Sequence, residues 1–207
     1  MVLPPRLWCI EHGGNQKRSE RTEIFMDERF REWSRRLQAS DREVCTEIFD
    51  ALHTPLLRYA ARLTDEATAY DAVQEAFVSL WQMRSSIDPD RSLRSLLYTL
   101  VRNEALNRRR ATQRRKNRHD EYASPRRPPS PDERVQTQAL QDRLRQWIDD
   151  LPERRREAFC LSRFDDLTHD EIADAMDITT RTVNNHVTEA LRTLRDQLRS
   201  HRSESEP

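Results

Sequence analysis

The chain has 207 residues but only two glycines, the adjacent Gly13 and Gly14. Tight turns between β-strands favour glycine, because glycine adopts positive φ angles that other residues avoid. Such a glycine-poor chain, rich in the helix formers Arg, Glu and Leu, argues against a turn-dense all-β fold. We therefore expect an all-α protein.

The segment over residues 71–84, DAVQEAFVSLWQMR, has the apolar spacing of a helix. Its buried stripe is expected to contain Val73, Ala76, Phe77 and Leu80. The remaining exposed positions combine two acids and an amide with two apolar residues: Asp71, Gln74, Glu75, Val78 and Trp81. A solvated helix face seldom mixes acids with an outward Val and Trp. The pattern predicts a surface that binds a protein partner.

A second helix is predicted over residues 92–110, SLRSLLYTLVRNEALNRRR. It is expected to bury Leu93, Leu97, Leu100 and Val101. Its other stripe is polar or basic except at Leu106 and contains Thr99, Arg102, Asn103, Leu106 and Arg109 or Arg110. Arg and Asn can each form paired hydrogen bonds with base edges, and a run of Arg suits phosphates. This helix is therefore expected to contact nucleic acid.

Charge is segregated along the chain although the overall net charge is zero. Residues 41–90 hold ten Asp and Glu against four Arg, a net charge of −6. Residues 102–127 hold ten Lys and Arg against three Asp and Glu, a net charge of +7. This distribution indicates one partner that prefers acid and another that is a polyanion.

A third signal lies near the C-terminal end, where two helices are predicted around a short turn. Thr168 and Glu171 form a capping box for THDEIADAM, the turn is Met176-Asp177-Ile178, and Thr179 caps the second helix. This is a helix-turn-helix. Its outward polar residues can reach bases and phosphates: Thr168, Thr180, Arg181, Thr182, Asn184, Asn185, His186 and Thr188.

These residues carry a resemblance to a known family. The order D-x-x-Q-E-x-F, a D-P loop, and L-L-Y-x-x-x-R-N-x-x-L-N-R-R-R resembles region two of the extracytoplasmic-function sigma factors of the sigma-70 family. It spans Asp41 to Arg110, and a second block spans Leu140 to Leu198. The chain departs from the family pattern at Leu96, where Trp is usual, at Asn107, where Asp is usual, and at Asp177, where Gly is usual.

The resemblance implies a protein that gives RNA polymerase its promoter specificity. The face with Asp71 would bind core polymerase, and the helix-turn-helix would read the minus-thirty-five element of promoter DNA. The minus-ten element would be contacted by the loop and the basic helix, through Ser85, Ser86, Asp88, Thr99, Arg102, Asn103, Asn107, Arg109 and Arg110. An anti-sigma factor is a further possible partner, since such proteins commonly hold this family inactive.

The expected fold is two small helical domains joined by a flexible Pro-rich linker. The expected boundaries are an N-terminal extension at 1–40, region two at 41–112, the linker at 113–138, region four at 139–200 and a tail at 201–207. Phe30, Trp33 and Leu37 have helical spacing, so one interpretation is that the extension adds a helix to the first domain. A second interpretation, which does not exclude the first, is that Met26 is the true start. Pro55 allows a kink or a break in the first helix of region two.

Catalytic, metal and membrane motifs are not evident in the sequence. Cys9, Cys45 and Cys160 have no paired spacing, Cys9 and His12 lack the second half of a zinc site, and no apolar run could span a membrane. We expect a cytoplasmic protein with no cofactor and no enzymatic activity. Two alternatives stay open: a helix-turn-helix regulator that binds an operator, and a nuclease that uses Asp71 and Glu75.

Overall fold

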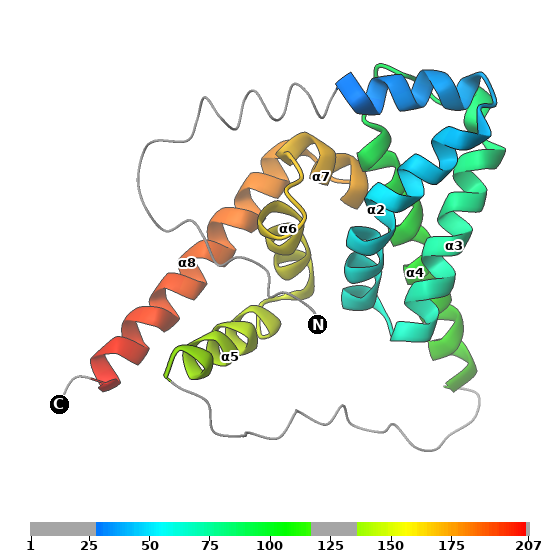
Figure 1. The fold of residues 1–207 in the computed structure, drawn as a ribbon. Coiled ribbons are helices and arrows are strands. Elements are labelled where there is room, and N and C mark those ends of the chain that lie inside the picture. The colour runs from blue at the N-terminus through cyan, green and yellow to red at the C-terminus, as the bar shows by residue number, and fades with distance from the viewer. Residues whose placement is uncertain (1–27, 117–135, 206–207) are drawn as a thin grey trace.

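The structure is a computed structural model, and it describes residues 28–116 and 136–205. Throughout these ranges the regular elements are helical, which confirms the expected all-α class (Figure 1). A first unit contains a helix over residues 28–38, then α2 (Arg42–Leu63), α3 (Glu66–Gln82), a short 3-10 turn η1 (Arg84–Ser86) and α4 (Leu93–Lys116). A second unit contains α5 (Gln136–Asp149), α6 (Glu153–Arg163), α7 (His169–Met176) and α8 (Thr180–Ser205). The extension before residue 28 and the linker over 117–135 lie outside the described residues.

The helix over residues 28–38 belongs to the core of the first unit. Phe30, Trp33 and Leu37 are buried, as their helical spacing predicted. The Trp33 indole donates a hydrogen bond of 3.0 Å to Glu47 on α2. The rings of Phe30 and Trp33 meet edge to face at 5.3 Å, a favourable aromatic geometry. The helix therefore packs on α2 and extends the region-two bundle at its N-terminal side.

Pro55 neither breaks nor ends α2, so of the two expected outcomes, a kink or a break, the break is wrong. The helix continues through it from Arg42 to Leu63. A proline inside a helix removes one backbone hydrogen bond and costs about 3 kcal/mol. The flanking residues Ile48, Leu52, Leu56 and Tyr59 are all buried. Their burial, at about 1.5–3 kcal/mol for each large apolar side chain, outweighs that cost.

One smaller expectation also needs correction. Phe77 was expected in the core but is only partly buried. In the second unit, Leu140 near the start of α5 is 43% exposed, and Pro152 immediately precedes α6.

The second unit is built around the predicted helix-turn-helix. Thr168 accepts a hydrogen bond from the Glu171 amide at 3.2 Å, and the Glu171 carboxylate accepts one from the Thr168 amide at 2.9 Å. This confirms the capping box at the start of α7. The Thr179 hydroxyl caps α8 by accepting from the Thr182 amide at 3.2 Å. Thr180 fixes the two helices to each other by donating to Asp170 at 2.8 Å.

The two units pack against each other, which the sequence did not predict. Figure 1 shows α6 and α7 beside α2 and α4. Buried residues of both units form one hydrophobic cluster, in which Leu97 and Val101 of α4 belong together with Leu161 and Ile172. A separate, smaller cluster holds the second unit together internally through α5, α6 and α8, and includes Ile148, Phe159 and Leu194.

Candidate functional surfaces

The first surface is the predicted protein-binding face of α3. Asp71, Gln74, Glu75 and Val78 are exposed there, and Trp81 is half-buried at the end of the same helix. Asp71 is not isolated, because the Arg108 guanidinium of α4 approaches its carboxylate to 3.3 Å. The face therefore combines carboxylates, an amide and apolar atoms in contact with solvent, as the sequence pattern predicted.

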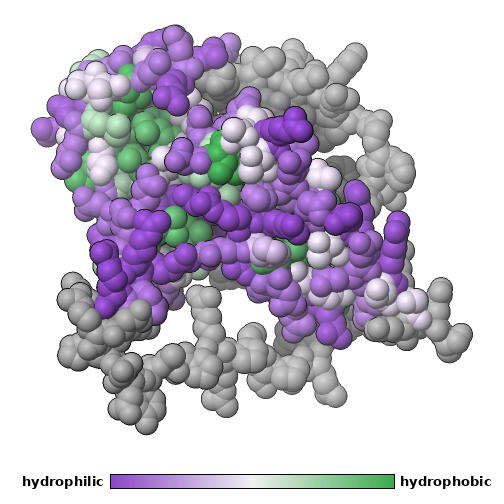
Figure 2. All heavy atoms as spheres, turned by 180° about the vertical axis from the view of Figure 1, so that it is seen from behind, coloured by the Kyte–Doolittle hydropathy of each residue, from purple (hydrophilic) through white to green (hydrophobic). Residues whose placement is uncertain are grey.

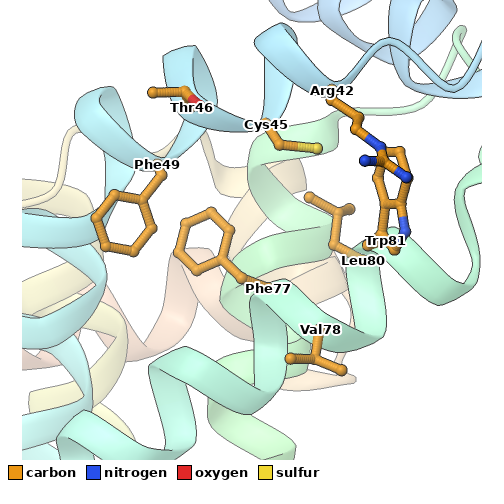
Figure 3. A pocket seen from close by; sticks show the side chains of 8 residues that line it. All are labelled: Arg42, Cys45, Thr46, Phe49, Phe77, Val78, Leu80 and Trp81. Atoms are coloured by element: carbon orange, nitrogen blue, oxygen red, sulfur yellow. The ribbon is translucent and has the colours of Figure 1, made fainter.

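An apolar groove of about 510 Å³ lies between α2 and α3, beside this face (Figure 3). We call it the α2–α3 groove; it is lined by Arg42, Cys45, Thr46, Phe49, Phe77, Val78, Leu80 and Trp81. The rings of Phe49 and Phe77 face each other across it with centroids 5.1 Å apart. Arg84 covers the Trp81 ring at 4.3 Å, a cation–π contact that holds this ring in place.

The sequence did not single out Phe49, which is 40% exposed at the groove. Phe49 lies on α2 outside the buried stripe of Val44, Ile48 and Leu52. An aromatic residue away from the buried stripe was the signal in the sequence that could have identified it. Hydrophobic side chains gather on the part of the surface that belongs to the first unit, whereas the rest of the face in Figure 2 is mostly hydrophilic. An exposed apolar groove of this kind typically marks a protein-binding site.

The second surface comprises the loop after α3 and the exposed side of α4. Ser85, Ser86 and Asp88 are exposed in the loop, and Asn103, Asn107, Arg109 and Arg110 are exposed on α4. Arg110 approaches the Asn107 side chain at 3.5 Å, and Arg109 pairs with Glu153 of the second unit at 2.6 Å. Asn103, Asn107 and Arg110 line a cavity of about 370 Å³ together with Arg154 of α6. These side chains supply the donors and acceptors that base edges and phosphates require.

Arg102 was expected on an outward stripe, but it is only 8% exposed. Its Nε donates a 2.7 Å hydrogen bond to Glu157 of α6, and the same carboxylate accepts a 2.8 Å bond from the Tyr59 hydroxyl. Burial, followed by the Glu157 charge, raises the pKa of Tyr59 well above its ordinary value. The Thr99 hydroxyl donates to the Ser95 carbonyl at 2.8 Å and also lies 3.4 Å from the Asp174 carbonyl. The packing of the second unit on α4 accounts for this difference.

The third surface is the outer face of the helix-turn-helix. Arg181, Asn184, Asn185 and Thr188 on α8 are exposed, as are Thr168 and Thr180, whereas Thr182 and His186 are half-buried. Burial, with smaller effects from Arg155 and Arg154, lowers the pKa of His186 below its ordinary 6.5. His186 is therefore neutral at pH 7, with one ring nitrogen as donor and the other as acceptor. The face offers several polar side chains on one exposed helix.

Metal ligands, cysteines and membrane spans were also considered from the sequence. Within residues 28–116 and 136–205, no group of three or more His, Cys, Asp and Glu could hold a metal ion. Cys45 is half-buried and Cys160 is buried, with burial raising the pKa of the Cys160 thiol to about 11. Cys9 and His12 lie outside the described part of the chain. No helix in that part is long and apolar enough to cross a membrane.

Comparisons with known proteins match both units. The sigma-70 region 2 family model matches residues 48–115, and the sigma-70 region 4 family model matches residues 141–194. The ECF RNA polymerase sigma factor SigK of Mycolicibacterium vanbaalenii is 25% identical over 166 residues, which are 78% of this chain and 85% of that protein.

Two solved structures share the fold. One is CnrH in complex with the cytosolic domain of CnrY, at a TM-score of 0.58 and 18% identity, covering 83% of this chain and 97% of that one. The other is the sigma factor RpoE in complex with the anti-sigma factor NepR from Bartonella quintana, at a TM-score of 0.58 and 21% identity, covering 74% and 96%. Region 2 and region 4 in this order, with a relative aligned along most of both chains, show that the chain belongs to the extracytoplasmic-function sigma factors of the sigma-70 family.

Proposed function

We propose that this sigma factor directs promoter-specific initiation through the three surfaces described above. The exposed face of α3 would bind the clamp helices of the largest subunit of core RNA polymerase. The loop over 85–92 and α4 would contact the minus-ten element. The helix-turn-helix would contact the minus-thirty-five element. We propose the corresponding boundaries as region two at 41–112 and region four at 139–200, preceded by a helix that packs on region two.

The polymerase-binding face carries the proposal. Gln74, Glu75 and Val78 are exposed on one helix whose opposite side is buried at Val73 and Ala76. The α2–α3 groove beside them adds apolar surface at Phe49 and Trp81. An interface with an apolar centre and a polar, charged rim matches this arrangement. A helix pair of the polymerase could lie along α3 with its basic side chains on the carboxylates.

The DNA assignments rest on the chemistry of α4 and α8. Asn103 and Arg110 are exposed beside a polar cavity, where an amide and a guanidinium can bond to an unpaired base and to phosphate. On α8, Arg181, Asn184 and Asn185 are exposed in the first turns of a helix-turn-helix recognition helix, the part that contacts base edges in this motif. Such contacts position a polymerase rather than perform chemistry. We infer that this chain is not an enzyme and that it acts in the cytoplasm, where the polymerase is.

We also propose an anti-sigma factor as a regulatory partner. One structural neighbour was solved with the anti-sigma factor NepR, and the other with the cytosolic domain of CnrY. The α2–α3 groove is the exposed apolar surface on region two that could accept a segment of such a protein.

The function is tested by a double substitution on α3, Gln74→Ala with Glu75→Lys. Both residues are exposed, so the helical content should stay unchanged by circular dichroism. We expect the variant to lose co-elution with core RNA polymerase, because a carboxylate facing a basic partner becomes a repelling charge. Glu32→Lys, an exposed residue on another helix, makes the same change of charge and should bind as the wild type does.

Core binding at wild-type strength by the double variant would remove the polymerase-binding role from this face. If the wild-type chain neither binds core polymerase nor permits initiation, but binds a palindromic operator tightly, it is a helix-turn-helix regulator instead.

A further inference from the structure

The polar cavity beside Asn103 and Arg110 is enclosed by side chains from three helices, α4, α6 and α7, and has a volume of about 370 Å³. The polar side chains that line it include Asn103, Asn107, Arg110, Arg154 and Asp177. Its volume lies within the range of about 300–1,000 Å³ that is typical of small-molecule sites. The cavity is therefore large enough for a small organic ligand as well as for a single ion.

Two guanidinium groups at this cavity have no carboxylate partner. The arginines that precede them on α4 all pair with acidic side chains: Arg94, Arg102, Arg108 and Arg109. Arg110 instead approaches the Asn107 side chain at 3.5 Å, and Arg154 donates a 3.3 Å hydrogen bond to the Met176 carbonyl. Within residues 28–116 and 136–205, neither Arg110 nor Arg154 forms an ion pair.

A phosphate group matches these two arginines. It carries up to two negative charges and three strong acceptor oxygens, and arginine binds it through two parallel N–H groups. Arg110 comes from α4 and Arg154 from α6, so one phosphate in the cavity could accept from both helices. The negative charge of such a ligand would compensate two positive charges that the described residues leave uncompensated.

The rest of the cavity wall fits a base and a ribose. Asn103 and Asn107 are both exposed and lie one turn apart on α4, and an Asn side chain can form paired hydrogen bonds with adenine. Leu106 adds apolar surface on the same helix, against which a base can lie. Asp177 supplies a carboxylate, which repels a phosphate but can accept hydrogen bonds from ribose hydroxyls, as an acidic residue does in dinucleotide sites.

We propose that this cavity binds a ribonucleoside monophosphate. The phosphate would lie at Arg110 and Arg154, the base at the two asparagines, and the ribose at Asp177. The inference goes beyond promoter recognition, because the ligand is a free nucleotide and because Arg154 and Asp177 belong to region 4 rather than to the proposed minus-ten surface.

Titration of the free chain with adenosine monophosphate tests the inference, by calorimetry and by ligand-observed nuclear magnetic resonance, which follows weak binding. Saturable binding of one nucleotide per chain is expected. Adenosine lacks the phosphate, and inorganic phosphate lacks the base and the ribose. Each should bind at least about tenfold more weakly than the nucleotide, because each loses a whole set of hydrogen bonds.

Arg110→Gln and Arg154→Gln each remove one guanidinium and keep a polar side chain. Both residues are exposed, so the helical content should stay unchanged by circular dichroism. Each variant should bind adenosine monophosphate at least about tenfold more weakly than the wild type does. The affinity for adenosine should stay the same in both variants, because adenosine has no phosphate for the arginine to bind.

Arg163→Gln is the matched control for Arg154→Gln. Arg163 is exposed on the same helix, and it does not line the cavity. This variant loses the same charge and should bind adenosine monophosphate as the wild type does.

Asp177→Asn tests the ribose contact, since it removes the carboxylate and keeps a residue that tolerates the same backbone conformation. The wild type should prefer adenosine monophosphate to its dideoxy form, which lacks both ribose hydroxyls. The Asp177→Asn variant should have lost most of this preference.

Three results would overturn the inference. One is the absence of saturable binding for all four common ribonucleoside monophosphates. Another is an equal loss of affinity in Arg154→Gln and Arg163→Gln, which would indicate attraction by overall charge alone. The third is a single-stranded deoxyoligonucleotide that binds more tightly than the nucleotide and depends equally on Arg154, which would assign the cavity to DNA. The titrations contain no polymerase, so failure of the proposed function appears separately, as wild-type chain that does not bind core polymerase.

Discussion

Arg181 is exposed near the start of α8, where its guanidinium can form paired hydrogen bonds with a guanine edge. A paired contact of this kind contributes about 1–3 kcal/mol of discrimination against the wrong base. Arg181→Ala should therefore lower the affinity for the preferred minus-thirty-five sequence. The affinity for promoters that are already substituted at the one or two contacted base pairs should stay unchanged. Binding of the holoenzyme to a panel of promoter substitutions measures this.

Arg195→Ala is the control, because Arg195 is exposed on the same helix but about four turns from its N-terminal end. An equal loss of affinity on every promoter of the panel would assign Arg181 to a phosphate instead of a base. His186 lies on the same helix, and burial lowers its pKa below the ordinary value. Because the pKa of His186 is lower in the folded chain than in the unfolded chain, protonation of this imidazole favours unfolding. The contribution of His186 to the free energy of unfolding is therefore lost as the pH falls below 6.5.

At the level of single residues, the sequence predicted features that depend on close neighbours along the chain. It did not predict contacts between residues that lie far apart in the sequence. Thr168, Glu171 and Thr179 were identified because a helix cap depends on residues within three or four positions. The pairing of Arg102 with Glu157 was not predicted, since it depends on how two units pack. An arginine on a polar stripe has the same sequence pattern whether DNA or a carboxylate faces it.

Among the elements, α7 ends in a conformation that favours glycine. Asp177 has φ 53° and ψ 56°, the left-handed region. The Ile178 amide donates to the Ala173 carbonyl at 3.0 Å and the Asp177 amide to the Asp174 carbonyl at 3.3 Å, the two bonds of a Schellman motif. A residue with a Cβ atom is disfavoured there by roughly 1–2 kcal/mol, and Asp somewhat less.

Asp177→Gly should therefore stabilise the chain by roughly 0.5–1 kcal/mol, despite the greater freedom of glycine in the unfolded state. Urea denaturation measures the change through the midpoint at constant slope. Asp177→Asn separates charge from backbone strain, since Asn tolerates the same conformation and should change stability little. A stabilised Asn variant with an unchanged Gly variant would attribute the effect to the charge.

The sequence predicted best those helices that have a long and regular apolar stripe. The helices over α3 and α4 were predicted because their stripes run over several turns, and α7 and α8 were predicted because they also have clear N-terminal caps. The break considered at Pro55 does not occur, because the stripe of α2 continues on both sides of it. The α2–α3 groove could not be predicted, since Phe49 and Phe77 come from two helices whose relative placement periodicity does not specify.

For the molecule as a whole, the two units are linked by a shared core. Residues from region 2 and region 4 belong to one hydrophobic cluster, to which region 2 contributes the larger part, and the Arg102–Glu157 pair lies between the two regions. Region 4 also has a separate, smaller cluster around Ile148, Phe159 and Leu194. A small isolated core supports little stability, so region 4 should depend on its contact with region 2.

This dependence predicts the unfolding behaviour of the chain. Trp33 is buried in region 2 and Trp147 is half-buried in region 4, so chains that keep only one tryptophan report on one region each. In urea, both wild-type reporters should show one coincident transition, the signature of all-or-none unfolding. With Glu157→Gln, the Trp147 transition should move to lower urea while the Trp33 transition moves much less. Two separate transitions already in the chain with Glu157 intact would mean that the contact between the regions adds little to the stability of region 4.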